Sequence, residues 1–201
     1  MENKGFSMAF CGLDGTGKST QIKNVETSLQ SQNFDTSRVK LDFSPFNDYG
    51  KSKISNYILN GLSGFIIIKE HSYFHVASKK HDFTLYDRHI LCYLAYAHAM
   101  GIKSTLLLKK GFSLYPPTND PDLTLYFDIE VKSALDRISA KSTTAINKNE
   151  TYETLSRAKG GYEMLIPHTK NVAVIDANKN SEDVFLQISS VVTKKIGHKL
   201  F

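Results

Sequence analysis

Short apolar runs alternate along the chain with segments whose apolar residues recur every three to four positions. The runs have the length of β-strands, whereas the recurring pattern is typical of amphipathic helices. This alternation predicts a three-layer, doubly wound α/β domain, in which helices flank a parallel five-stranded sheet. The expected strands are Ser7–Cys11, Thr36–Leu41, Phe83–Tyr86, Leu123–Ile129 and Asn171–Asp176. The expected helices span 52–60, 64–80, 91–100, 131–138 and 181–195, with two more that end near 32 and 166.

Length and composition indicate one domain over residues 1–201. The chain is 41% hydrophobic and 22% charged, which allows a buried core and argues against disorder. Two cysteines, Cys11 and Cys92, are too few for a disulfide framework and favour a reducing compartment. The apolar runs fall far short of the ~20 residues of a membrane span, and the first residues lack the pattern of a signal peptide. We therefore expect a cytoplasmic protein with no membrane partner.

The net charge of +5 suggests an anionic ligand without saying which. Only four of the 25 basic residues are arginines, and the lysines are scattered along the chain. A nucleic-acid-binding protein usually concentrates its basic residues in a stripe or a recognition motif. The charge pattern therefore argues against nucleic acid as the main partner and leaves a small anionic molecule.

A phosphate-binding loop follows the first expected strand. The segment GLDGTGKS matches the pattern G-x-x-x-x-G-K-[ST], and a helix begins within it. Its glycines allow backbone N–H groups to surround phosphate oxygens, the lysine can reach the β and γ phosphates, and the serine hydroxyl can hold Mg²⁺. This P-loop predicts a nucleoside triphosphate site with ATP and Mg²⁺ as cofactors. Its binding residues are Gly12, Asp14, Gly15, Thr16, Gly17, Lys18, Ser19 and Thr20.

Two acidic residues and one arginine accompany this loop. Asp14 could orient an acceptor hydroxyl, an arginine or a metal-bound water, or it could be an exposed loop acid. Asp87 and Arg88 follow the third strand, at the edge of the sheet where ligands bind in doubly wound folds. Asp87 can accept from Ser19 or from a water on Mg²⁺, and Arg88 can clamp a phosphate with two hydrogen bonds. A surface ion pair is the simpler alternative for Asp87 and Arg88.

These residues resemble the thymidylate kinase family over nearly the whole chain. GLDGTGKST resembles its phosphate loop, and LYDRHILCYLAY (85–96) resembles its D-R-[YH]-x-x-S-x-x-A-[FY] signature. PDLTLYFDI (121–129) is similar to a family strand, ALDR (134–137) to the helix whose arginine packs on the donor adenine, and VIDAN (174–178) to the loop beside that adenine. Chain length and motif order agree with the bacterial type.

The resemblance implies an ATP- and Mg²⁺-dependent kinase of a dTMP-like nucleoside monophosphate, and a homodimer. Arg137 and Ala177 would lie at the adenine, and Ser19 and Asp87 at the metal. Lys18, Asp14 and Arg88 would act in catalysis together with Lys141 and Lys148 of a mobile lid over about 141–150. The acceptor would contact Phe43, Pro45, Phe74, Ser78, Arg88 and Tyr96.

Several positions depart from the family pattern. Ser78 stands where the family has an arginine that reads the thymine edge, and Cys92 and Ala97 replace polar residues. The lid carries lysines where the bacterial type has arginines. Loss of base-reading hydrogen bonds should weaken discrimination among nucleotides. Two alternatives therefore stay open, a kinase of another small-molecule or modified-nucleotide acceptor and a regulatory protein that binds ATP and hydrolyses it slowly.

Overall fold

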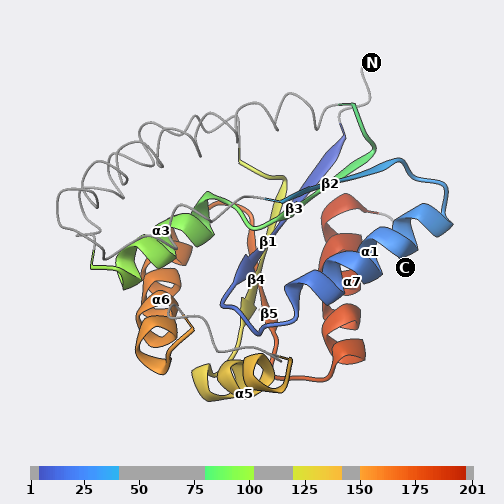
Figure 1. Ribbon diagram of the computed structural model, residues 1–201. Coiled ribbons are helices and arrows are strands. Elements are labelled where there is room, and N and C mark those ends of the chain that lie inside the picture. Colours follow the sequence, from blue (N-terminus) through green and yellow to red (C-terminus); the bar gives the residue numbers. More distant parts are fainter. Residues whose placement is uncertain (1–4, 41–79, 102–119, 142–149, 198–201) are drawn as a thin grey trace.

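The computed structural model describes residues 5–40, 80–101, 120–141 and 150–197 (Figure 1). Five parallel strands form one sheet in the order β2-β3-β1-β4-β5. The parallel pairing and the crossovers confirm the predicted doubly wound sheet, and each expected strand is found within two residues of its predicted ends. The strands are β1 (Phe6–Gly12), β2 (Thr36–Lys40), β3 (Phe83–Asp87), β4 (Leu123–Asp128) and β5 (Val172–Asp176).

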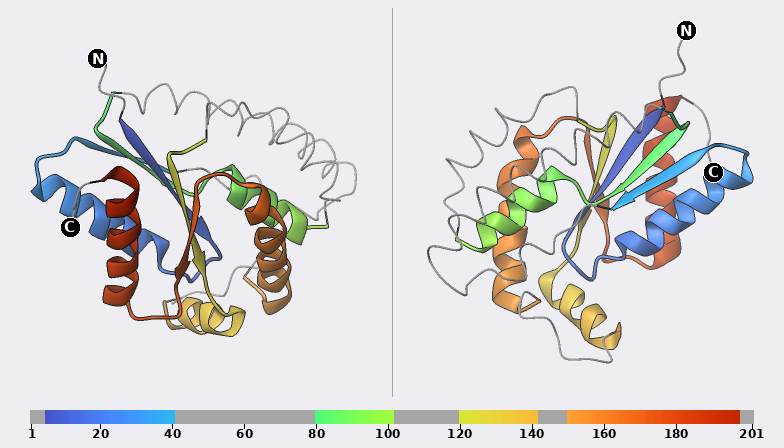
Figure 2. Two further views of the ribbon diagram at one scale, coloured as in Figure 1. Left: turned by 180° about the vertical axis from the view of Figure 1, so that it is seen from behind. Right: turned by 45° about the horizontal axis from the view of Figure 1, so that its top comes forward.

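Helices cover both faces of the sheet. Figure 2 shows α1 and α7 together on one face and α3 and α6 on the other, while α5 lies beyond the carboxyl end of β4. This arrangement is the three-layer order expected from the sequence. The helices are α1 (Lys18–Ser31), α3 (Ile90–Ala99), α5 (Val131–Lys141), α6 (Tyr152–Leu165) and α7 (Ser181–Ile196), with a 3₁₀ turn η3 (Ile166–His168) after α6.

The core lies around the three central strands. Every residue of β3, and all but the first of β1 and the last of β4, is buried, whereas β2 and β5 at the sheet edges are only partly buried. A parallel sheet with helices on both faces buries its central strands almost completely, which explains why these strands read as mainly apolar runs in the sequence. The carboxyl ends of β1, β3 and β4 are thereby held in fixed register, and the candidate site is built on them.

One expected boundary is wrong. The sequence predicts that the helix after β4 ends at Ile138 and that a loop begins at Lys141, but α5 continues to Lys141. Ser139 and Ala140 are compatible with a helix, and a lysine in the last turn is favourable beside the helix carboxyl end. Lys141 is therefore a helical residue. The rest of the expected lid up to 149 lies outside the described residues, as do the expected helix 52–60 and all but the last residue of the expected helix 64–80.

Two side chains cap the amino ends of α6 and α7. The Thr151 hydroxyl accepts from the backbone N–H of Thr154 at the start of α6, and the Asn180 side chain accepts from Asp183 at the start of α7. Such caps satisfy N–H groups that a helix leaves unpaired in its first turn. Among the helices that the structure describes, none has both the length and the apolar character needed to cross a membrane.

Candidate active site

Three glycines shape the loop between β1 and α1. Gly12, Gly15 and Gly17 have φ angles of +145°, +83° and +86°, which other residues rarely adopt. A Cβ at Gly12 would lie 2.7 Å from the carbonyl oxygen of Phe127, and a Cβ at Gly15 would lie 2.4 Å from that of Ala134. The loop therefore packs directly on the backbone of β4 and α5. This packing holds the amino end of α1, with its unpaired N–H groups, where phosphate oxygens can bind.

Alanine substitutions at Gly15 and Gly17 should have different effects. Gly15→Ala would force its methyl group into the α5 backbone, so we expect a loss of stability of about 2 kcal/mol or more. At Gly17 no atom of the described chain lies within 4 Å of an added Cβ, so only the left-handed backbone cost of roughly 1–2 kcal/mol applies. Gly17 also lines the cavity described below, so its methyl group should weaken ATP binding. Thermal unfolding and calorimetric ATP titration of both variants check this, and equal destabilisation would contradict it.

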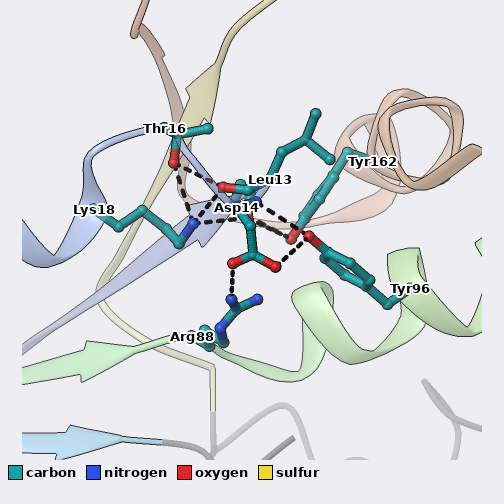
Figure 3. A network of polar contacts seen from close by, with 8 residues as sticks. Leu13, Asp14, Thr16, Lys18, Arg88, Tyr96 and Tyr162 are labelled. Carbon is teal, nitrogen blue, oxygen red and sulfur yellow. Dashed lines mark hydrogen bonds and ion pairs between the residues drawn. The ribbon is translucent and has the colours of Figure 1, made fainter. Parts of the chain in front are cut away.

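Lys18 is buried and folds back onto the loop (Figure 3). Its Nζ donates to the carbonyl oxygens of Gly12 at 3.0 Å and Leu13 at 2.5 Å, and to the hydroxyl of Thr16 at 3.1 Å. Thr16 in turn donates to the Leu13 carbonyl. Thr16 is thus a loop-shaping residue, whereas the Lys18 ammonium is the group that can carry charge to a bound phosphate.

Binding of ATP should take up a proton at about pH 9. Burial and the neighbouring Arg88 charge lower the pKa of Lys18 to about 8, although Asp14 partly opposes the shift. A triphosphate beside Lys18 favours the ammonium form, so the pKa rises again on binding. Affinity should therefore decrease as the pH rises above 8. Calorimetry in buffers of different ionisation enthalpy measures the proton uptake. An equal uptake by Lys18→Met would show that the proton does not bind to Lys18.

Asp14, Arg88 and Tyr96 form one network beside the loop (Figure 3). The Arg88 guanidinium makes an ion pair with Asp14 Oδ1. The Tyr96 hydroxyl donates to Asp14 Oδ2 at 3.0 Å and accepts from the Asp14 backbone N–H at 3.1 Å. Asp14 is therefore held by two partners from the segment after β3. Of the options left open by the sequence, the arginine is the partner that the structure gives it.

The charges of this network are fixed by its partners. Burial raises the pKa of Asp14, but the charges of Arg88 and Lys18 outweigh it and leave this pKa below its usual value. Burial and the Asp14 charge raise the pKa of Tyr96, and Asp14 keeps that of Arg88 high in spite of burial. At neutral pH the site therefore holds a carboxylate, a guanidinium and a neutral phenol.

Arg88 owes its direction to an uncommon backbone conformation. Its φ is +79°, and its backbone N–H donates to the carbonyl oxygen of Phe10 at 3.2 Å. A non-glycine residue held in this region costs roughly 1–3 kcal/mol and is found most often at functional sites. The turn aims the side chain at Asp14, with the guanidinium carbon 5.8 Å from the centre of the Tyr96 ring.

Asp87 has a partner that the sequence analysis missed. Arg38 of β2 donates to Asp87 Oδ2 at 2.6 Å, and the Asp87 side chain is only 5% exposed. Asp87 and Ser19 line the same cavity. Hydroxyl and carboxylate oxygens of this kind are typical Mg²⁺ ligands when the metal also binds phosphate. Ser19 and Asp87 are therefore the residues that could hold a metal ion here.

A cavity of about 360 Å³ lies at the carboxyl ends of β1, β2 and β3 and reaches α5. It brings together most of the predicted binding and catalytic residues. Three other predicted residues do not line the cavity but hydrogen-bond to residues that do: Gly12 and Thr16 accept from Lys18, and Tyr96 donates to Asp14. The lining residues are Asp14, Gly15, Gly17, Lys18, Ser19, Thr20, Lys40, Asp87, Arg88, Arg137, Ile138, Lys141 and Glu150.

Arg137 joins this cavity to the loop after β5. Its Nη1 donates to the carbonyl oxygen of Ala177 at 2.9 Å, and its Nη2 lies 3.4 Å from the carbonyl oxygens of Asn178 and Lys179. Ala177 is fully buried, so it contributes to the site through the hydrogen bond that its carbonyl oxygen accepts from Arg137. The guanidinium plane held in this way can stack on a planar ring.

Two buried contacts that the sequence did not predict support the loop. The Tyr162 hydroxyl of α6 accepts from the Gly12 N–H at 3.3 Å and donates to the Gly12 carbonyl at 3.2 Å. The thiols of Cys11 and Cys92 lie beside each other and are fully buried. Cys92 therefore packs against β1, so its thiol belongs to the core rather than to the cavity wall. Phe43, Pro45, Phe74, Ser78 and Lys148, which the sequence places at the acceptor or in the lid, lie outside the described residues.

The family model for thymidylate kinase matches residues 10–188 of the chain. This stretch contains the phosphate loop, the Asp14–Arg88–Tyr96 network and the Arg137 contacts. The chain belongs to the thymidylate kinase family. The family resemblance of the sequence motifs is thereby confirmed, and with it membership in a family of phosphotransferases that convert dTMP to dTDP with ATP.

Curated thymidylate kinases match over almost their full length. The thymidylate kinase of Finegoldia magna is 26% identical over 204 residues, which cover 94% of this chain and 98% of the relative. The thymidylate kinase of Mesoplasma florum is 29% identical over 207 residues, with coverages of 92% and 93%. The solved structure of thymidylate kinase from Candida albicans has a TM-score of 0.68 at 17% identity and covers 97% of this chain and 94% of its own. That structure supports the fold.

Proposed function

We propose that this chain transfers the γ-phosphoryl group of ATP to dTMP and releases ADP and dTDP. The observation that carries the proposal is that Asp14 and Arg88, held by Tyr96, line one cavity together with Lys18. Lys18 belongs to a loop that binds the phosphates of a donor, and Arg88 is a second phosphate-binding cation on the neighbouring strand. A site with two such cations can hold donor and acceptor phosphates side by side.

The donor would lie across the phosphate loop. Backbone N–H groups at the start of α1 and the Lys18 ammonium would bind its phosphates, and Arg137 would lie against its adenine. Mg²⁺ would be held by Ser19 and Asp87 together with phosphate oxygens, where it would neutralise charge on the transferring group. Support for the metal comes from the oxygen ligands that these two residues offer to the same cavity.

Charge stabilisation would provide most of the catalysis. The transferring phosphoryl spreads negative charge over its oxygens, so fixed cations lower the barrier. Lys18 and Arg88 would act from the sheet, and Lys141 at the end of α5 and Lys148 from the lid side. A phosphate acceptor is already nucleophilic, so no strong base is required. Asp14 would fix the orientation of Arg88 through their ion pair.

Base selection would be weaker than in relatives that keep the base-reading arginine. Phe74 would stack on the acceptor ring, and stacking alone tolerates different bases. Ser78 and Ala97 stand at positions where the family pattern has polar or charged base-reading residues. We therefore propose that dTMP is accepted but that other pyrimidine nucleotides compete within roughly ten- to a hundredfold, the range that shape alone provides.

A substrate comparison tests both parts of the proposal. ADP release and product nucleotide would be measured with ATP, Mg²⁺ and dTMP, dUMP, UMP, CMP or thymidine, with Lys18→Met as the inactive control. Formation of dTDP at the highest kcat/KM supports the function. ATP hydrolysis that no acceptor stimulates would refute it, and a preference for dTMP of several thousandfold would refute the weakened base reading. Light scattering of the eluted protein would test the expected homodimer.

A further inference from the structure

The cavity contains a lysine that no sequence motif includes. Lys40 is the last residue of β2 and lines the cavity together with Lys18, Asp87 and Arg88. The strand register pairs Lys40 with Asp87 of β3, so their side chains leave the same face of the sheet. An exposed lysine at the carboxyl edge of the sheet is thereby directed toward the region where ligands bind in this fold.

Lys40 is not needed to neutralise Asp87. Arg38, two residues earlier on the same strand, already donates to Asp87 Oδ2 at 2.6 Å. Within the described parts of the chain Lys40 itself has no ion pair or hydrogen bond. Among the described residues it therefore differs from Lys18, Arg88 and Arg137, whose charged groups all bind protein groups.

The order of the strands decides which phosphate Lys40 can reach. The adenine side is marked by Arg137 and the loop after β5, at one edge of the sheet. The phosphate loop follows β1 in the centre, and Arg88 follows β3. β2 forms the opposite edge of the sheet. A donor that runs from β5 to β1 leaves the region above β3 and β2 for the acceptor, so Lys40 lies on the acceptor side of Arg88.

We propose that Lys40 binds the phosphate of the acceptor nucleotide and is a catalytic residue of this enzyme, an assignment that rests on the function proposed above. Lys141 at the end of α5 lines the same cavity. Lys40 adds a lysine from the edge strand β2. As a compact charge on a flexible stem, it can follow the phosphate as the new bond forms.

Binding and rate measurements on Lys40→Met test the proposal. We expect kcat/KM for dTMP to decrease roughly 10- to 100-fold, the range of one hydrogen bond to a charged group. The affinity for a non-hydrolysable ATP analogue should change less than threefold, and Lys40→Arg should keep most of the activity. Lys23→Met, an exposed lysine on α1 away from the cavity lining, is the matched control and should behave as wild type.

Equilibrium binding separates this proposal from the proposed function. The ratio of dTMP to thymidine affinity isolates the phosphate contact, and Lys40→Met should lower that ratio at least tenfold while thymidine binding stays unchanged. If the wild-type enzyme does not phosphorylate dTMP, the proposed function fails, and the same ratio is measured for whichever nucleoside monophosphate binds. An unchanged ratio, an equal loss of ATP-analogue binding, or no nucleoside monophosphate that binds more tightly than its nucleoside would overturn the role of Lys40.

Discussion

A Lys18→Met enzyme should keep its fold and lose phosphoryl transfer by roughly three orders of magnitude. Lys18 is the buried cation of the phosphate loop, and methionine has a similar length without the charge. The substitution removes the free-energy cost of burying a charged group, which is the main reason why the pKa of Lys18 is lowered to about 8. It also removes one of the two donors to each of the carbonyl oxygens of Gly12 and Leu13, which keep their hydrogen bonds from Tyr162 and Thr16. These effects on stability oppose each other, so the unfolding midpoint should move by only a few degrees.

Two measurements on the same preparation separate loss of function from loss of fold. ADP release in the presence of dTMP gives the rate, and thermal unfolding gives the stability. Lys23→Met removes an exposed lysine from the same helix and should leave both unchanged. A well-folded Lys18→Met enzyme with more than a tenth of wild-type turnover would show that the phosphates are bound elsewhere.

Much of the fold could be predicted because local sequence patterns determine it. β1, β3 and β4 are buried on both faces, so their sequences are mainly apolar without a helical period and stand out from the helical segments. The end of α5 was harder to predict. Ser139–Lys141 has no apolar periodicity that separates a last helical turn from a loop, and the structure continues the helix there.

The candidate site likewise has one part that the sequence predicts and another that it does not. The phosphate loop is contiguous, so its residues and their spacing could be recognised directly. The partners of Asp87 and Gly12 could not, because they come from distant segments. Arg38 and Asp87 are 49 residues apart, and Tyr162 is 150 residues from Gly12. The one available signal was that Arg38 lies on the expected strand that precedes the strand of Asp87 along the chain, but pairing and register are needed to use it.

Arg88→Lys should reduce kcat/KM for dTMP by roughly 10²–10³ while ATP-analogue affinity changes little. Lysine keeps the charge but cannot bind Asp14 and a phosphate at once with the planar geometry of a guanidinium. Asp14→Asn keeps the shape of the side chain and its hydrogen bond from Tyr96 but removes the charge that holds Arg88. We expect a smaller loss, of about tenfold, from this variant.

The double variant decides what Asp14 does. If Asp14 acts by positioning Arg88, its substitution has little left to disturb once the guanidinium is gone, so the double variant should be no slower than Arg88→Lys alone. Residues that act as one unit give such non-additive effects, whereas independent groups give effects that multiply. Losses that multiply to about 10³–10⁴ would assign Asp14 a separate contact, with the acceptor hydroxyl or with a metal-bound water. Steady-state rates for the wild type, both single variants and the double variant complete the cycle, with unfolding curves to confirm that all four proteins are folded.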